Sequence, residues 1–188
     1  DGYKARVPAG WLSLLVNAGD GIDLDVFLTR QPKDRMIRKL GQQLRINRSK
    51  IKEASDTNTD FDDLDGAIRS GYFLKDGLSN NEDFYYLNLL ITVTADSVDD
   101  LEWKVAEMKK LLLSQDMDVQ TCSFCQEQAF LSSLPLVSLE RQLYERSKRN
   151  VLTSGAASCY PFTSYEMCDD NGILLGVNKH NNSLIIVD

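Results

Sequence analysis

The chain has 188 residues, 43% of them hydrophobic, and a formal net charge of -7 at pH 7. This composition supports one large or two small folded domains, whereas the negative charge argues against a general nucleic-acid-binding surface. No apolar run approaches the roughly 20 residues that a membrane-spanning helix needs, and no signal-peptide pattern is present. We therefore expect a cytoplasmic protein whose cysteines are free thiols.

The first predicted element is an antiparallel β-hairpin. The apolar residues 11–16 are followed by turn-forming residues at 17–21, and apolar and polar side chains then alternate from Ile22 to Leu28. Such alternation is typical of a strand with one solvent-exposed face. Asp23 and Asp25 in this strand could form an acid or metal site, but the strict alternation favours a solvent-facing role for both.

A strongly basic helix is predicted next, because apolar residues recur at helical spacing from Ile37 to Ile51, after a Pro32 suited to a helix start. A basic helix can bind an acidic membrane surface or an acidic partner. The alternative is a solvated face, which is what charge runs usually form. Four arginines of this helix are the candidate docking surface: Arg35, Arg38, Arg45 and Arg48.

Residues 56–65 predict an acidic loop that leads into a helix from about residue 60, and residues 75–83 a polar connection. Phe61, Phe73 and Leu78 lie among acids in segment 56–83. This segment is therefore a second candidate docking surface, suited to a basic partner.

The centre of the chain predicts a strand, a helix and a second strand. Residues 85–94 form the first strand pattern, Ser97 can cap a helix over residues 98–112, and residues 117–121 alternate again as a short strand. A strand–helix–strand unit of this kind is nearly always parallel and right-handed.

The four cysteines leave three alternatives open. Cys122 and Cys125 stand at the entry of a helix that Pro135 ends, where a redox pair would lie. A zinc site would need Cys159 and Cys168 as further ligands, but these are nine positions apart, unlike a second C-x-x-C. Buried structural thiols are the interpretation we favour.

The last elements are a charged helix at residues 139–149, a small-residue hinge at 153–158, and a hairpin of strands at 172–178 and 183–188. His180, the one histidine, falls on the polar turn of this hairpin and is expected to be an exposed turn residue. The elements together predict an α+β fold. It has a mixed sheet built from an N-terminal β-hairpin and a β-α-β unit packed with helices, a linker helix, and a C-terminal β-hairpin.

Two passages resemble a known family. The first is residues 128–136 (Gln-Ala-Phe-Leu-Ser-Ser-Leu-Pro-Leu), and the second is residues 161–164 (Pro-Phe-Thr-Ser) leading to the Gly172-x-x-x-Gly176-x-Asn178 hairpin. They are similar to the ATPases of conjugative type IV secretion, in the form found on mobile elements. In that family the first passage closes the N-terminal α/β domain, and the second opens the motor domain shortly before its phosphate-binding loop.

The resemblance implies a division into an N-terminal α/β docking domain at residues 1–137, a helical linker and hinge at 138–158, and the first strands of a truncated ATPase domain at 159–188. The chain starts at Asp1 without Met and ends directly after an apolar run, so we expect a segment of a longer protein. It contains no G-x-x-x-x-G-K-[ST] or G-x-G-x-x-G motif, and no catalytic residue is assigned.

The implied function is a non-catalytic domain that serves assembly and docks a motor for conjugative DNA transfer onto the membrane complex. This segment is expected to need no cofactor, whereas the full-length ATPase would use ATP and Mg²⁺. Expected partners are inner-membrane components of the secretion complex, with self-association of the full-length protein at the cytoplasmic face of the membrane and no direct nucleic-acid binding. The alternatives are a stand-alone α+β enzyme with a carboxylate or thiol site, and a small zinc-stabilised binding module.

Overall fold

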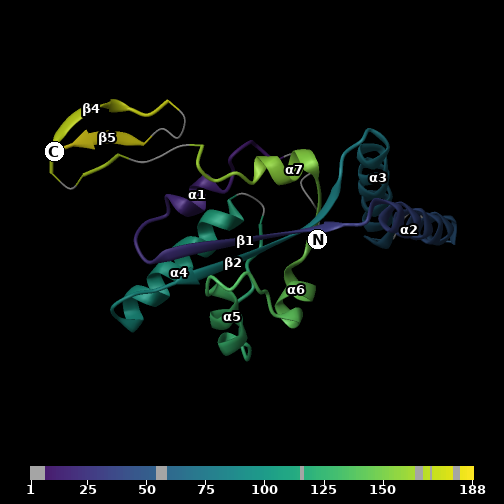
Figure 1. Cartoon of the computed structure of the whole chain (residues 1–188), viewed down its shortest axis with the longest axis horizontal. Helices are drawn as coiled ribbons and strands as arrows, with labels where there is room; N and C mark the ends of the chain where they lie inside the picture. The colour runs from purple at the N-terminus through teal and green to yellow at the C-terminus, as the bar shows by residue number, and fades with distance from the viewer. Residues whose placement is uncertain (1–6, 54–58, 115–116, 164–166, 170, 180–182) are drawn as a thin grey trace. The chain divides into compact units, whose positions relative to one another are not determined.

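The computed structural model describes residues 7–53, 59–114, 117–163, 167–169, 171–179 and 183–188. It confirms the predicted α+β fold class (Figure 1). In chain order the elements are α1 (Ser13–Val16), β1 (Ile22–Gln31), α2 (Lys33–Glu53), α3 (Thr59–Ser79), β2 (Phe84–Val93), α4 (Val98–Leu113), α5 (Gln126–Ser133), α6 (Arg141–Ser147), β3 (Arg149–Leu152), α7 (Thr153–Ser158), β4 (Ile173–Val177) and β5 (Leu184–Val187).

The chain folds into two compact units, each assembled from separate stretches of sequence. The first unit comprises Asp1–Val7, Val26–Leu89 and Glu127–Ala157, and the second comprises Pro8–Asp25, Leu90–Gln126 and Ser158–Asp188. The strands β1 and β2 therefore contribute residues to both units.

The main sheet has the strand order β1-β2-β3. Strands β2 and β3 are antiparallel, with Phe84 opposite Leu152. Strands β1 and β2 also run in opposite directions, because Arg30 near the end of β1 pairs with Asp83 just before β2, at 2.9 Å. Phe84 and Leu152 are both buried and lie in one apolar cluster, so this strand pair forms the sheet's side of the core.

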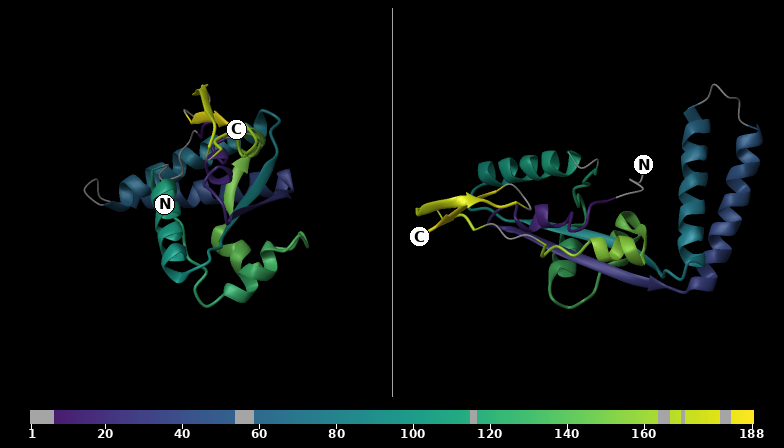
Figure 2. Two further views of the ribbon diagram at one scale, coloured as in Figure 1. Left: turned by 90° about the vertical axis from the view of Figure 1, so that its left-hand side faces the viewer. Right: turned by 90° about the horizontal axis from the view of Figure 1, so that it is seen from above.

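Helices α2 and α3, which follow β1 and precede β2 in the chain, form an antiparallel pair (Figure 2). Met36 and Leu40 of α2 and Leu78 of α3 are buried in the same cluster as Phe84 and Leu152. Farther along the pair, Gly71 lets α3 approach Leu44, because a Cβ at this glycine would lie 2.9 Å from the Leu44 side chain. Burial of each of these large apolar side chains stabilises the packing by about 2 kcal/mol.

In the second unit, the buried apolar residues come mainly from the segment around α1 and from α4. Leu12, at the start of α1, and Leu15, within it, are fully buried. Met108 and Leu112 are buried on one side of α4. Helix α4 begins where the sequence predicts, because the Ser97 hydroxyl accepts a hydrogen bond from the Asp100 backbone N–H at 3.2 Å. The structure thus confirms the predicted cap and helix.

The predicted C-terminal hairpin is also confirmed. Strands β4 and β5 are antiparallel, with Ile173 opposite Val187 and an irregularity between Leu174 and Gly176. The backbone of Met167 accepts a hydrogen bond from Ile186 at 2.8 Å, so residues 167–169 run along the outer edge of β5.

The first part of the predicted polar connection at residues 75–83 is the end of α3, where Leu78 is buried. Three further predicted elements are wrong. Residues 11–16 contain the helix α1 rather than a strand, so there is no N-terminal hairpin, and Leu12 and Leu15 reach the interior through helical spacing. Residues 117–121 form no strand, so the predicted parallel β-α-β unit is absent. The third error is the small-residue hinge at 153–158, which is the helix α7.

The missing parallel strand has a physical explanation. The side of β2 away from β1 is occupied by β3, a strand from the segment predicted as a helical linker. The main sheet is therefore antiparallel rather than mixed. The segment 138–158, predicted as a linker, contributes the strand β3 to the main sheet and the buried Leu152 to the core. The division of the chain into domains at residues 137 and 158 stays a prediction.

Candidate functional site

The four predicted docking arginines lie along one side of α2. Their spacing of three, seven and three residues keeps them within an arc of about 140° over a length of roughly 20 Å. All four side chains are exposed. We call this set, Arg35, Arg38, Arg45 and Arg48, the arginine stripe.

The stripe is not neutralised within the part of the chain that the structure describes. Arg45 donates from Nε to the Gly41 carbonyl at 3.3 Å, and the Arg48 guanidinium lies 6.0 Å from the centre of the Tyr72 ring. None of the ion pairs seen among the described residues involves a stripe arginine. The positive charge of the stripe is therefore open to a partner.

Helix α2 concentrates positive charge in an otherwise acidic chain. It contains eight basic and two acidic residues, a surplus of six positive charges, whereas the whole chain has a net charge of -7. Met36, Leu40 and Leu44 occupy the opposite side of the helix and are buried. Because α2 has already buried its apolar side, it presents charge rather than a membrane-inserting surface.

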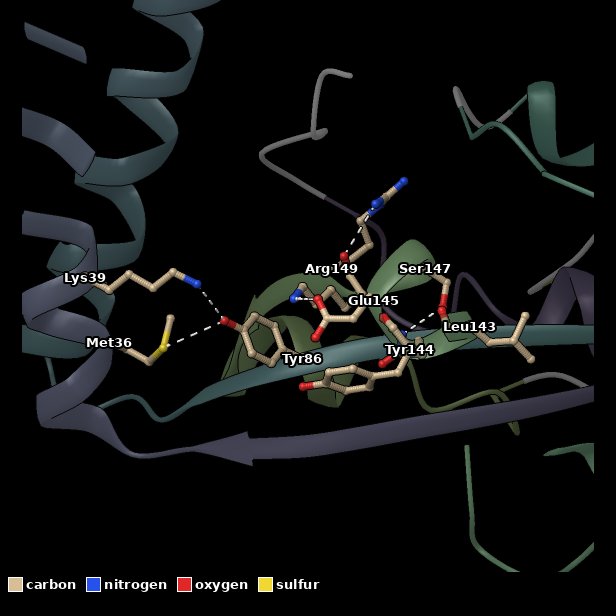
Figure 3. A network of polar contacts seen from close by, with 10 residues as sticks. Met36, Lys39, Tyr86, Leu143, Tyr144, Glu145, Ser147 and Arg149 are labelled. Carbon is tan, nitrogen blue, oxygen red and sulfur yellow. Dashed lines mark hydrogen bonds and ion pairs between the residues drawn. The ribbon is translucent and has the colours of Figure 1, made fainter. Parts of the chain in front are cut away.

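A polar network holds α2 against the sheet (Figure 3). Lys39 donates from Nζ to the Tyr86 hydroxyl at 3.3 Å, and this hydroxyl lies 3.9 Å from the Met36 sulfur. From the direction of α6, the ammonium of Lys148 lies 5.4 Å from the centre of the Tyr86 ring and 5.7 Å from that of Tyr144. Two cations therefore contact one buried tyrosine, which ties α2 and α6 to β2.

The same network buries an amide. Asn88 of β2 is 1% exposed, and its Nδ2 donates to the Tyr144 carbonyl at 2.9 Å and to the Ser147 hydroxyl at 2.7 Å. Its Oδ1 is buried and has no hydrogen-bond partner among the described residues. These bonds fix the C-terminal turn of α6 on the sheet, which is a structural role.

At the end of α6, Lys148 and Glu145 form an ion pair. Lys148 donates a hydrogen bond to Glu145, which raises the pKa of Lys148 and lowers the pKa of Glu145. Burial and the neighbouring Tyr86 raise the pKa of Tyr144 above its usual value. Each group is thus held in its ordinary charge state at neutral pH.

The cysteines lie in different environments. Cys125 and Cys159 are buried, Cys122 is half-buried and Cys168 is exposed. Burial raises the pKa of the Cys159 thiol above its usual value. Within the described residues, no group of three or more His, Cys, Asp or Glu side chains is arranged to hold a metal ion.

The other candidates from sequence are placed as follows. Asp23 is exposed, whereas Asp25 is half-buried and its pKa is raised, first by burial and then by the charge of Asp23. Asp23 therefore faces solvent as the alternation predicts, and Asp25 does so only in part. Leu78 of the second docking candidate is fully buried in the core and cannot contact a partner, whereas Phe73 is 54% exposed. His180 lies outside the described residues.

Sequence reasoning found the arginine stripe but missed the network at Tyr86 and Asn88. The available signal was a polar asparagine in the middle of a mostly apolar strand pattern at residues 84–93.

None of the helices in the described ranges has the length and apolarity to cross a bilayer. Neither the known protein-family models nor the curated protein sequences contain a match to this chain.

Proposed function

We propose that this chain is a non-catalytic assembly and docking module of a motor for conjugative DNA transfer. The module works at the cytoplasmic face of the membrane, where the arginine stripe contacts an anionic partner within the secretion complex. The family assignment rests on the resemblance to conjugative ATPases of residues 128–136 and of residues 161–164 with the C-terminal hairpin that follows them. In this proposal ATP and Mg²⁺ are bound by the motor domain of the full-length protein.

The observation that supports docking most directly is the open charge of the stripe. Lys39 and Lys148 are held against tyrosines, and Arg30 is paired with Asp83. The stripe arginines make no such ion pair with a described residue. Exposed arginines on one helix side match carboxylate or phosphate groups through planar, two-pronged hydrogen bonds.

The test is charge reversal in the full-length protein. Arg35→Glu, Arg38→Glu and Arg45→Glu together should leave folding and ATP hydrolysis intact, while abolishing DNA transfer and recovery of the protein with membranes. These positions are exposed, so little folding stability depends on them. Measured quantities are transfer frequency, ATPase rate and the membrane-bound fraction.

A matched variant reverses three exposed charges elsewhere, Lys109→Glu, Arg141→Glu and Arg146→Glu, with the same change in net charge. It should transfer DNA normally, which separates the stripe from a general effect of charge. Normal transfer by the folded stripe variant would show that the stripe is not the docking surface.

A further inference from the structure

Helix α4 has an exposed tryptophan on its outer side. Trp103 is 62% exposed and lies nine positions before the buried Leu112, which places the two on opposite sides of the helix, about 180° apart. Asp99, one turn before Trp103, and Glu102, next to it, are also exposed. We call Asp99, Glu102 and Trp103 the Trp103 face.

The acids of this face differ from their neighbours on α4. Asp100 pairs with Lys104 at 3.3 Å and Glu107 pairs with Lys110 at 2.6 Å. Asp99 and Glu102 form none of the ion pairs found in the described ranges. The face therefore combines open negative charge with a large exposed aromatic ring, and tryptophan is enriched at the energetic centres of protein interfaces.

We infer that the Trp103 face binds the arginine stripe of a second copy of this chain. The inference rests on the proposed docking role of the stripe, for which it names the anionic partner. The argument is charge complementarity: the stripe is open and positive, and the Trp103 face is open and negative. Arginine is also the cation that pairs best with both carboxylates and an indole ring.

Apolar contact is available on both surfaces. Ile46, next to Arg45 on α2, is 46% exposed and can cover part of the Trp103 ring. Burying the ring removes apolar area from water and places the surrounding ion pairs in a less hydrated setting, which strengthens them.

The two surfaces of the contact differ, so the contact is heterologous. Repeating it from copy to copy closes a ring or extends a filament. Assembled copies would dock on the membrane complex with higher avidity than one copy.

The first test measures self-association of the 188-residue chain by analytical ultracentrifugation over a range of concentration and salt. The wild type should associate reversibly, and added salt should weaken the association because the contacts are ionic. Asp99→Arg with Glu102→Arg, Arg38→Glu with Arg45→Glu, and Trp103→Ala should each weaken it at least tenfold. The control Asp20→Arg with Asp118→Arg changes two exposed acids elsewhere and should associate normally.

The decisive measurement mixes the two charge-reversed variants. Each is weakened alone, but in the mixture the new arginines of one meet the new glutamates of the other, so association should return. Restored association supports the inference. A monomeric wild type, or a mixture that stays monomeric, would overturn it. Binding of a monomeric wild type to vesicles of phosphatidylcholine and phosphatidylglycerol would overturn it too, and would assign the stripe to lipid.

Transfer assays separate this inference from the proposed function. If stripe reversal abolishes transfer while Asp99→Arg with Glu102→Arg leaves it normal, the docking role stands and the second-copy partner is wrong. If co-expression of the two reversed variants restores transfer that each lacks alone, both are supported. If neither variant affects transfer, the proposed docking role fails.

Discussion

Asn88 is a buried amide on a strand whose other buried side chains are apolar or aromatic. Its two N–H donors point at the Tyr144 carbonyl and the Ser147 hydroxyl of α6, so the position requires a donor. A buried polar group is tolerated when it is hydrogen-bonded and is costly when it is not. Asn88 thus helps to fix the position of α6 on the sheet. The buried Leu143 of α6 contributes apolar packing to the same end.

Replacement of Asn88 by Asp should destabilise the fold by about 3 kcal/mol at neutral pH, because a buried carboxylate would face the Tyr144 carbonyl without a cation. Burial should raise the pKa of the new carboxyl above its unfolded value. The penalty should therefore be small below the unfolded pKa of about 4 and grow as the pH rises through the folded pKa. Urea unfolding at several pH values measures it.

The control for this prediction is Ser147→Ala, which removes one acceptor of the Asn88 amide. It should cost about 1 kcal/mol and show no comparable dependence on pH. Equal stability of Asn88→Asp and wild type at neutral pH would mean that water or a cation reaches position 88.

At the scale of single residues, the sequence predicts which charged side chains are exposed better than it predicts which polar side chains are buried. The stripe arginines are exposed as expected, because a guanidinium rarely enters a core without a partner. The Tyr86 network was not predictable, because it joins residues from α2, β2 and α6 that lie far apart in the sequence; Asn88 and Ser147, for example, are bonded across 59 positions. Only the fold brings them together.

Elements were predicted well where local signals were strong. Helices α2 and α4 have helical apolar spacing and, in α4, the Ser97 cap, and both form as expected. The short run at residues 11–16 carried no periodicity that separates strand from helix, and tertiary packing of Leu12 and Leu15 decided it. Strand β3 has only four residues, too few to show alternation.

Two glycines of α3 test how that helix packs on the sheet. A Cβ at Gly77 would lie 2.2 Å from the Leu152 side chain of β3, whereas a Cβ at Gly66 would meet nothing within 4 Å. Gly66→Ala should stabilise the protein by up to about 1 kcal/mol, because alanine loses less backbone entropy in a helix. Gly77→Ala gains the same helix propensity but must displace a buried leucine, so it should destabilise by about 1–2 kcal/mol net.

Thermal or urea unfolding of the two variants measures this difference, and each serves as the control for the other. If both substitutions stabilised the protein to the same degree, α3 would not pack on Leu152 as the structure has it. Because the two sites lie on one helix, a general effect on α3 cannot produce opposite signs.

At the scale of the whole molecule, the sequence does not reveal that each compact unit is built from separate stretches. Strands β1 and β2 each pass from one unit to the other, so no change of composition marks the boundary. Linker segment 138–158 carries the charged helix and small residues typical of a linker, yet it pairs a strand with β2. Pairing between strands that lie far apart in the sequence depends on how the whole core packs, and the local sequence pattern does not reveal it.

The last prediction concerns nucleotide. The chain lacks the glycine-rich loop and lysine that surround the β- and γ-phosphates in motor ATPases, so it should not bind Mg-ATP tightly or hydrolyse it. The arginine stripe could still attract the phosphates weakly, and calorimetry should therefore show at most a small heat that does not saturate and vanishes in added salt. The Arg35→Glu, Arg38→Glu and Arg45→Glu variant should lose even that heat. Saturable micromolar binding that persists in this variant would show a nucleotide site elsewhere in the chain and would contradict a purely non-catalytic role.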